Sequence, residues 1–241
     1  TVQGIGNGAR SAFIGGGAGN DTISVSVLSG VAQTGGWGTL MGGGGNDTIL
    51  FSATQGLASD LNTGGISAGY IQGGLGADRI SFNGTESGAA ATLLYTDAAE
   101  SNIAGHDYVS ANLNDGGAGV IVSGALVFDV GAVNSAVDLA SGEGKNGNGG
   151  LSYTATNGIV TFSGALSNNL ADQVSALDQN EVNGTVAIFS KGGTSTRYLF
   201  MQGGAAGTPD DLLVELDAGV AGSYGSVSLP TNSGISVDFI N

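Results

Sequence analysis

One eight-residue pattern occurs three times in the first half of the chain. It reads GGAGNDTI, GGGGNDTI and GGLGADRI, beginning at Gly16, Gly42 and Gly73. The sixth residue is always aspartate and the eighth always isoleucine, and successive aspartates are 26 and 31 residues apart. A period of about 30 residues is typical of proteins in which one structural unit stacks on the next. The pattern therefore predicts similar layers, each with a glycine-rich turn at the same corner.

Each copy lies between two segments with β-strand character. Short runs of β-forming residues follow the copies, at residues 22–28, 48–54 and 79–84. An apolar residue stands two positions before each first glycine: Ile14, Leu40 and Ile71. A shortened fourth copy keeps Gly105, Asp107 and Val109, and its aspartate follows Asp78 by 29 residues. We therefore expect strand, turn and strand in every layer, with the isoleucines packed inside.

Charge is scarce in this chain and almost all of one sign. The 241 residues include 20 acidic and 5 basic ones, which gives a formal net charge of −15. Nucleic acids and anionic membranes attract clustered Lys and Arg, so the composition excludes both as partners. No apolar run approaches the ~20 residues of a membrane-spanning helix. Carboxylates crowded on one fold repel each other, and cations are therefore the expected partners.

Calcium is the cation that the repeated pattern favours. It binds carboxylate and carbonyl oxygens, and glycines allow backbone carbonyls to turn inward. The pattern Gly-Gly-x-Gly-x-Asp-x-apolar resembles the calcium-binding repeats of the RTX (repeats-in-toxin) proteins. The resemblance implies bound Ca²⁺ that is coupled to folding. It makes these residues the candidate ligands: Gly17, Gly19, Asp21, Gly43, Gly45, Asp47, Gly74, Gly76, Asp78 and Asp107.

The repeats and the composition together predict a mainly β fold. We expect an irregular parallel β-roll or β-helix solenoid over residues 1–118. One motif per layer would place ions along only one side of the stack. The chain has 47 glycines and no cysteine, so turns and metal, rather than disulfides, are expected to fix this fold.

Residues 119–241 are predicted to form a β-rich C-terminal cap with one helix near 166–178. Four apolar residues recur there at helical spacing: Leu166, Leu170, Val174 and Leu177. Ser167 or Asn168 is the expected N-cap of this helix. The glycine-rich segment 141–150 is expected to be a loop.

A second resemblance covers residues 184–218. The segments YLF and DDLLVEL, with a glycine-rich acidic turn between them, are similar to the bluetail module of bacterial surface proteins. This resemblance implies a C-terminal cap and export by type I secretion, and the ending SVDFIN fits such a route. The acidic residues here could form another calcium site or a solvated face, and we favour the solvated face: Asp210, Asp211, Glu215 and Asp217.

Motifs that suggest catalysis are weak in this sequence. GISAG places Ser67 at the nucleophile position of G-x-S-x-G, but that elbow needs a strand before it and a helix after it, and neither pattern is present. GEGKNG at 142–147 matches G-x-G-x-x-G, yet the residues that follow cannot open a stable helix. The single histidine, His106, occupies the variable position before the fourth motif aspartate and is expected to be a turn residue. We therefore expect no enzymatic activity.

Two functions remain open from the sequence. The first is a secreted structural protein at the cell surface, a subunit of a calcium-dependent surface layer or extracellular filament that assembles with itself. A cell-surface polysaccharide is a further candidate partner. The second is the non-catalytic, calcium-binding C-terminal region of a type I-secreted enzyme or adhesin.

Overall fold

A computed structural model gives the fold of the parts of the chain that it describes. These are residues 2–4, 13–27, 39–53, 67–84, 90–113, 125–129, 137–138, 144–146, 151–156, 158–164, 167–181, 184–192, 194, 196–203, 210–217, 223–228 and 234–240. They are mainly β-strand, which confirms the predicted class. No helix among them has the length and apolar character needed to cross a membrane.

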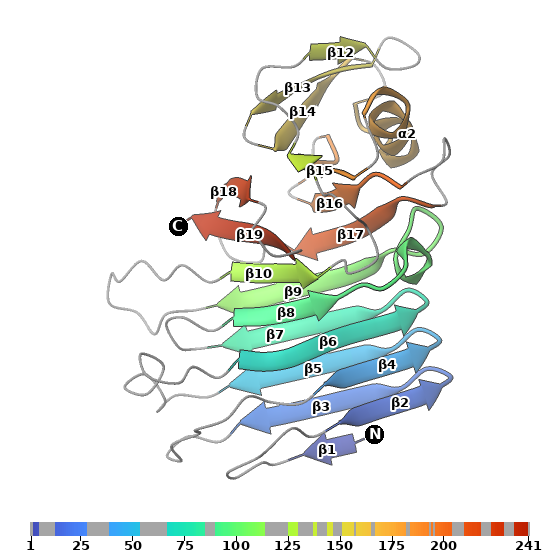
Figure 1. Cartoon of the computed structure of the whole chain (residues 1–241), viewed down its shortest axis with the longest axis vertical. Helices are drawn as coiled ribbons and strands as arrows, with labels where there is room; N and C mark the ends of the chain where they lie inside the picture. The colour runs from blue at the N-terminus through green and yellow to red at the C-terminus, as the bar shows by residue number, and fades with distance from the viewer. Residues whose placement is uncertain are drawn as a thin grey trace.

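The repeat half builds two parallel sheets between which the chain alternates (Figure 1). A 12-stranded sheet contains β1 (Val2–Gly4), β3 (Thr22–Val27), β5 (Thr48–Ala53), β7 (Arg79–Gly84) and β9 (Asp107–Leu113). A 7-stranded sheet contains β2 (Ile14–Ala18), β4 (Leu40–Gly44), β6 (Ser67–Leu75), β8 (Ala90–Leu94) and β10 (Ala125–Asp129). Each layer therefore contributes one strand to each sheet.

The strands of successive layers pair in the register that the motifs set. Ile23 pairs with Ile49, Ile49 with Ile80, and Ile80 with Val109. All four side chains are at most 1% exposed, as expected for residues that fill the interior between the sheets. The pairing holds although the spacing between motifs changes from 26 to 31 and then 29 residues. The extra residues therefore lie outside the paired strands.

The tail continues both sheets. It contains β11 (Val137–Asp138), β12 (Gly144–Asn146), β13 (Ser152–Thr156), β14 (Ile159–Ser163), α2 (Leu170–Asn180), β15 (Thr185–Ser190), β16 (Arg197–Met201), β17 (Leu212–Asp217), β18 (Ser223–Ser228) and β19 (Gly234–Ile240). Strand β17 pairs with β9, and β10, which lies beyond residue 118, pairs with β8. Hydrogen-bonded pairing thus crosses the predicted boundary at residue 118 in both sheets, and the division into domains stays a prediction.

The glycine-rich segment 141–150 is not entirely a loop, so that prediction was wrong in part. Residues 144–146 form β12, which pairs antiparallel with β13 through Lys145 and Tyr153. The following strand, β13, supplies the pairing partner, and glycine tolerates the extended backbone that this pairing requires. Composition alone gave no indication of that partner.

Helix α2 begins later than the sequence indicated. Its N-cap is Asn169, whose side-chain oxygen accepts hydrogen bonds from the backbone N–H of Ala171 at 3.0 Å and of Asp172 at 3.4 Å. The prediction of Ser167 or Asn168 as the cap was wrong, because the carbonyl of Ser167 is held by the backbone N–H of Gly192 at 3.1 Å. Leu166 lies outside the described residues.

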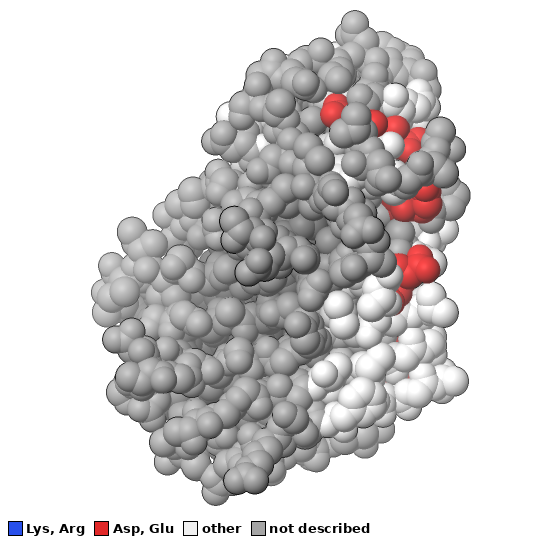
Figure 2. All heavy atoms as spheres, in the orientation of Figure 1, with Lys and Arg blue, Asp and Glu red and all other residues white. Residues whose placement is uncertain are grey.

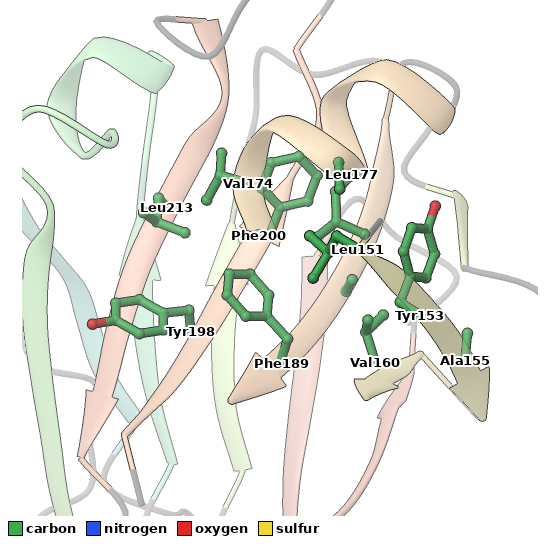
Figure 3. Close-up of a cluster of buried hydrophobic side chains, with 12 residues drawn as sticks. Leu151, Tyr153, Ala155, Val160, Val174, Leu177, Phe189, Tyr198, Phe200 and Leu213 are labelled. Atoms are coloured by element: carbon green, nitrogen blue, oxygen red, sulfur yellow. The ribbon is translucent and has the colours of Figure 1, made fainter. Parts of the chain in front are cut away.

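The tail has its own apolar core beneath α2 (Figure 3). Val174 and Leu177 on the helix pack with Phe189, Phe200 and Leu213 from the strands, and all five side chains are fully buried. Burial of a large apolar side chain contributes about 1.5–3 kcal/mol. The tail is therefore stabilised by a hydrophobic core of its own, in addition to the apolar side chains buried between the two sheets of the repeat half.

Candidate metal site

The structure brings the four motif aspartates into a hydrogen-bonded column, named here the aspartate ladder: Asp21, Asp47, Asp78 and Asp107. The backbone N–H of Asp21 donates to Oδ1 of Asp47 at 2.7 Å, and that of Asp47 donates to Oδ1 of Asp78 at 2.7 Å. The backbone N–H of Asp78 donates to Oδ1 of Asp107 at 2.9 Å. Each aspartate therefore links its layer to the next.

The tail closes one end of the aspartate ladder. The backbone N–H of Asp107 donates to the hydroxyl of Ser101 at 2.8 Å. That hydroxyl in turn donates to the carbonyl of Leu213 in β17. Ser101 is fully buried and stands where a further motif aspartate would stand in a longer ladder. The backbone N–H of the last aspartate is thus bonded to a side-chain oxygen, as in the other layers, and this side chain joins the last layer to the tail.

Three carboxylates of the aspartate ladder are removed from solvent. Asp47 and Asp78 are 1% exposed and Asp107 is fully buried. Figure 2 accordingly shows little red at the lower right, where the turns of the repeat half lie. Oδ2 of Asp107 accepts a hydrogen bond from the hydroxyl of Tyr95 at 3.0 Å. Oδ2 of Asp47 and Oδ2 of Asp78 are buried without a hydrogen-bond partner, which is costly for an ionised group.

A backbone carbonyl faces the same space as Oδ2 of Asp47, and the first glycine of the motif lies against each of the two oxygens. A Cβ atom added to Gly42 would lie 2.3 Å from Oδ2 of Asp47 and 2.4 Å from the carbonyl oxygen of Gly73 in the next layer. At Gly73 it would lie 2.3 Å from Oδ2 of Asp78. The first glycine of each motif is therefore required because the carboxylate packs against its α-carbon. The sequence analysis did not include Gly42 and Gly73 among the candidate ligands.

The glycines at the second and fourth positions of each motif, which were the predicted carbonyl ligands, form the turn itself. Six of them have positive φ values between 98° and 138°: Gly17, Gly19, Gly43, Gly45, Gly74 and Gly76. Their backbones stack closely, since a Cβ on Gly43 or Gly74 would lie 2.0 Å from a carbonyl oxygen of the preceding layer. These glycines are needed for layer spacing, and their role as calcium ligands stays a prediction.

The donors at this corner suit a calcium ion. Among the described residues, no three acidic or histidine side chains gather closely enough to enclose a metal by themselves. The available oxygens are instead the unpaired carboxylate oxygens of Asp47 and Asp78 and neighbouring backbone carbonyls. Calcium accepts this mixture of oxygen ligands, whereas zinc favours nitrogen and sulfur. Asp47 and Asp78, with carbonyls such as that of Gly73, are the residues that would hold the ion.

The motif asparagines form a second column that runs the opposite way. The backbone N–H of Asn46 donates to Oδ1 of Asn20 at 2.9 Å, and that of Ala77 donates to Oδ1 of Asn46 at 3.1 Å. In the fourth copy His106 replaces the asparagine, and its Nε2 lies 3.0 Å from Oε2 of Glu215 in β17. His106 therefore connects the last layer to the tail, a contact that the sequence analysis did not anticipate.

A polar network beside the fourth copy was also missed. Glu100 is 5% exposed; its Oε1 accepts from Nε2 of Gln72 at 2.8 Å, and its Oε2 accepts from the backbone N–H of Thr96 at 3.4 Å. Glu100 belongs to the short 3₁₀ helix η1 (Ala98–Glu100). Gln72 and Glu100 are 28 residues apart, and nothing in either local sequence indicates the contact.

Burial raises the pKa values of two carboxyls in the aspartate ladder. The pKa of Asp78 is raised to about 6, mainly by loss of hydration and also by the charges of Asp47 and Glu100, while the hydrogen bond from the Asp47 N–H lowers it. Loss of hydration likewise raises the pKa of Asp107 to about 8, and the charges of Asp78 and Glu100 act in the same direction. Without a cation, the folded chain therefore keeps Asp107 protonated at neutral pH and protonates Asp78 once the pH falls below about 6.

Calcium-free protein should lose stability as the pH rises from about 4 to about 8. The folded pKa values of Asp78 and Asp107 lie above the ordinary value of 3.8, so the folded state binds more protons than the unfolded state in this range. We expect the free energy of unfolding to fall by at least about 2 kcal/mol, measured by urea titration after exhaustive chelation. Saturating calcium should abolish or reverse the trend, because the ion binds ionised carboxylates. A calcium-free stability that increases over this range would contradict the prediction.

The catalytic alternative at Ser67 lacks its required geometry. Ser67 is the first residue of β6, which continues as a strand to Leu75. The nucleophile elbow needs a helix directly after the serine. The described residues therefore do not form that elbow.

Comparison of the sequence with protein-family models and with curated proteins finds no match. The case for a functional site therefore rests on the geometry of the aspartate ladder and on the chemistry of its donors.

Proposed function

We propose that the chain is a secreted structural protein, a subunit of a calcium-dependent bacterial surface layer or extracellular filament. In this proposal the repeat half is a parallel β-roll, and calcium bound along its motif corner joins each layer to the next. The tail caps the roll and takes part in assembly. The protein has no catalytic role and acts outside the cell.

The observation that carries the proposal is the pair of buried, unpaired carboxylate oxygens on Asp47 and Asp78. A chain with 20 acidic and 5 basic residues has few cationic side chains to neutralise such groups. No described Lys or Arg forms an ion pair with these carboxylates; calcium would supply two positive charges there, and its binding would add directly to folding stability. A protein that is ordered only where calcium is abundant suits an extracellular location.

The edges of the sheets support self-assembly. Among the described strands, the 12-stranded sheet ends at β1 and β12, and the 7-stranded sheet ends at β2 and β18. An edge strand presents unpaired backbone donors and acceptors that a strand of another molecule can join. A head-to-tail contact between two different edges does not close on itself and gives filaments or sheets. Another copy of the same chain is therefore the expected principal partner.

Electron microscopy of the purified protein should show calcium-dependent assembly. We expect filaments or sheets at a calcium concentration of about 1–10 mM, above the dissociation constants of about 0.1–1 mM of weak extracellular sites, and dispersed particles after chelation. Magnesium at the same concentration is the control, since it is smaller, demands near-octahedral geometry and gives up its waters reluctantly. Calcium-loaded protein that stays monomeric at all concentrations would contradict the structural role. It would favour instead the non-catalytic region of a secreted enzyme or adhesin.

A further inference from the structure

Three elements of the tail meet at the Gln202–Gly203 peptide, far along the chain from the aspartate ladder. Gln202 directly follows β16, Asp211 directly precedes β17, and Asp178 lies near the end of α2. Nε2 of Gln202 donates to the carbonyl of Asp178 at 2.6 Å and to its Oδ1 at 3.2 Å. The backbone N–H of Gly203 donates to Oδ1 of Asp211 at 2.9 Å. Two carboxylates therefore flank one short segment of backbone.

Two buried oxygens at this junction have no hydrogen-bond partner. They are Oε1 of Gln202 and Oδ2 of Asp211. Gln202 is 5% exposed and Asp211 is 1% exposed, so water cannot readily satisfy either oxygen. Exchanging the oxygen and nitrogen of the Gln202 amide would not help, because Nε2 already faces two acceptors on Asp178. The junction has more acceptors than donors.

The expectation of a solvated acidic face was wrong for Asp211, because its side chain is buried. The pKa of Asp211 is raised to about 7, mainly by loss of hydration and also by the charges of Asp178 and Asp210. Asp210 is also close, since a Cβ added to Gly203 would lie 2.1 Å from its carbonyl oxygen. Figure 2 shows acidic side chains gathered on this side of the molecule, with no described Lys or Arg visible in that view.

We propose that Asp178, Gln202 and Asp211 form a second calcium site, located in the tail and independent of the aspartate ladder. The donors are two carboxylates and an amide carbonyl, with the backbone carbonyl of Asp210 nearby; all are oxygen ligands of the kind calcium prefers. The ion would satisfy the two unpaired oxygens and offset the repulsion between the carboxylates. It would also tie the end of α2 to the start of β17.

The test is a calcium titration of the full chain followed by ¹H–¹⁵N NMR. The Gly203 amide, which donates to Asp211, should shift with calcium in the wild-type protein. Asp211→Asn keeps the shape of the side chain and removes its charge, and it should bind about one calcium ion fewer per chain. Asp97→Asn is the control, because it removes the same charge at an exposed position, where the Asp97 carboxylate accepts a hydrogen bond from the nearby Ala99 N–H. This variant should bind as many calcium ions as the wild-type protein.

The outcomes separate this site from the ladder. In Asp47→Asn the Gly203 amide signal should still shift with calcium. The test of the tail site therefore remains valid even if the ladder does not bind calcium. The tail site is overturned if the wild-type Gly203 amide does not respond to calcium. It is also overturned if Asp211→Asn binds as many ions as Asp97→Asn, which would mean that Asp211 is a neutral acid donating its proton to a neighbouring oxygen.

Discussion

Removal of calcium should unfold the repeat half of the protein. A site held at 100 times its dissociation constant stabilises the folded state by about 2.7 kcal/mol, and occupied sites at separate junctions add to one another. Such a sum is comparable with the whole stability of a typical domain, about 5–15 kcal/mol. The layers bury apolar side chains such as Ile49, Phe51 and Leu93, and this packing must offset the repulsion of the buried carboxylates once calcium is removed.

The measurement is amide hydrogen exchange at Asp47 and Asp78, whose N–H groups form the ladder, with and without chelator. We expect their protection to fall by at least about 100-fold on chelation, which corresponds to the stabilisation by a single site. Amides of Phe189 and Phe200 in the apolar core of the tail serve as internal references, and they should lose less protection. Equal protection of the ladder amides in both conditions would show that calcium does not hold the layers together.

Alanine at Gly43 should be far more disruptive than alanine at Gly17, although both occupy the same motif position. Both glycines have positive φ, 112° and 104°, so each alanine costs about 1–2 kcal/mol through its backbone conformation. A Cβ on Gly43 would also lie 2.0 Å from the carbonyl oxygen of Gly17, whereas one on Gly17 meets nothing within 4 Å. Overpacking adds about 1–3 kcal/mol, so we expect a total loss of roughly 3 kcal/mol or more at Gly43.

Urea titration in saturating calcium measures both losses. Gly44→Ala is the matched control, because Gly44 adjoins Gly43, has no positive φ and has open space around its α-carbon. That variant should be neutral or slightly stabilising. Equal destabilisation by Gly43→Ala and Gly17→Ala would mean that the layers do not stack as closely as the structure has them.

The features that the sequence predicted are those set by its repeats. The phase of Ile23, Ile49 and Ile80 indicated which side chains point inward, and the structure buries all three. Recurrence of the aspartates indicated a column, and consecutive aspartates are hydrogen-bonded to one another. Strands after the motifs were placed within about one residue, because β-branched runs bounded by glycine have few alternatives.

The features that could not be predicted depend on contacts between distant residues. Ser101 closes the ladder only because β17, which supplies the carbonyl of Leu213, pairs beside β9. The burial of Asp211 depends on its position at the start of β17 against Gly203, and its local sequence resembles an ordinary acidic turn. In both cases the local residues are compatible with several environments, and the long-range pairing of strands selects one of them.

The constant register between layers has a consequence for how such a protein can change in length. Each layer contacts only its neighbours, and residues added between motifs leave the paired strands in register. Duplicating one motif with its two strands would lengthen the stack of layers by one strand spacing, about 4.8 Å, without altering the tail. The repeat half can therefore serve as a spacer whose height is adjustable in equal steps, while the surface that the tail offers to its partners stays the same.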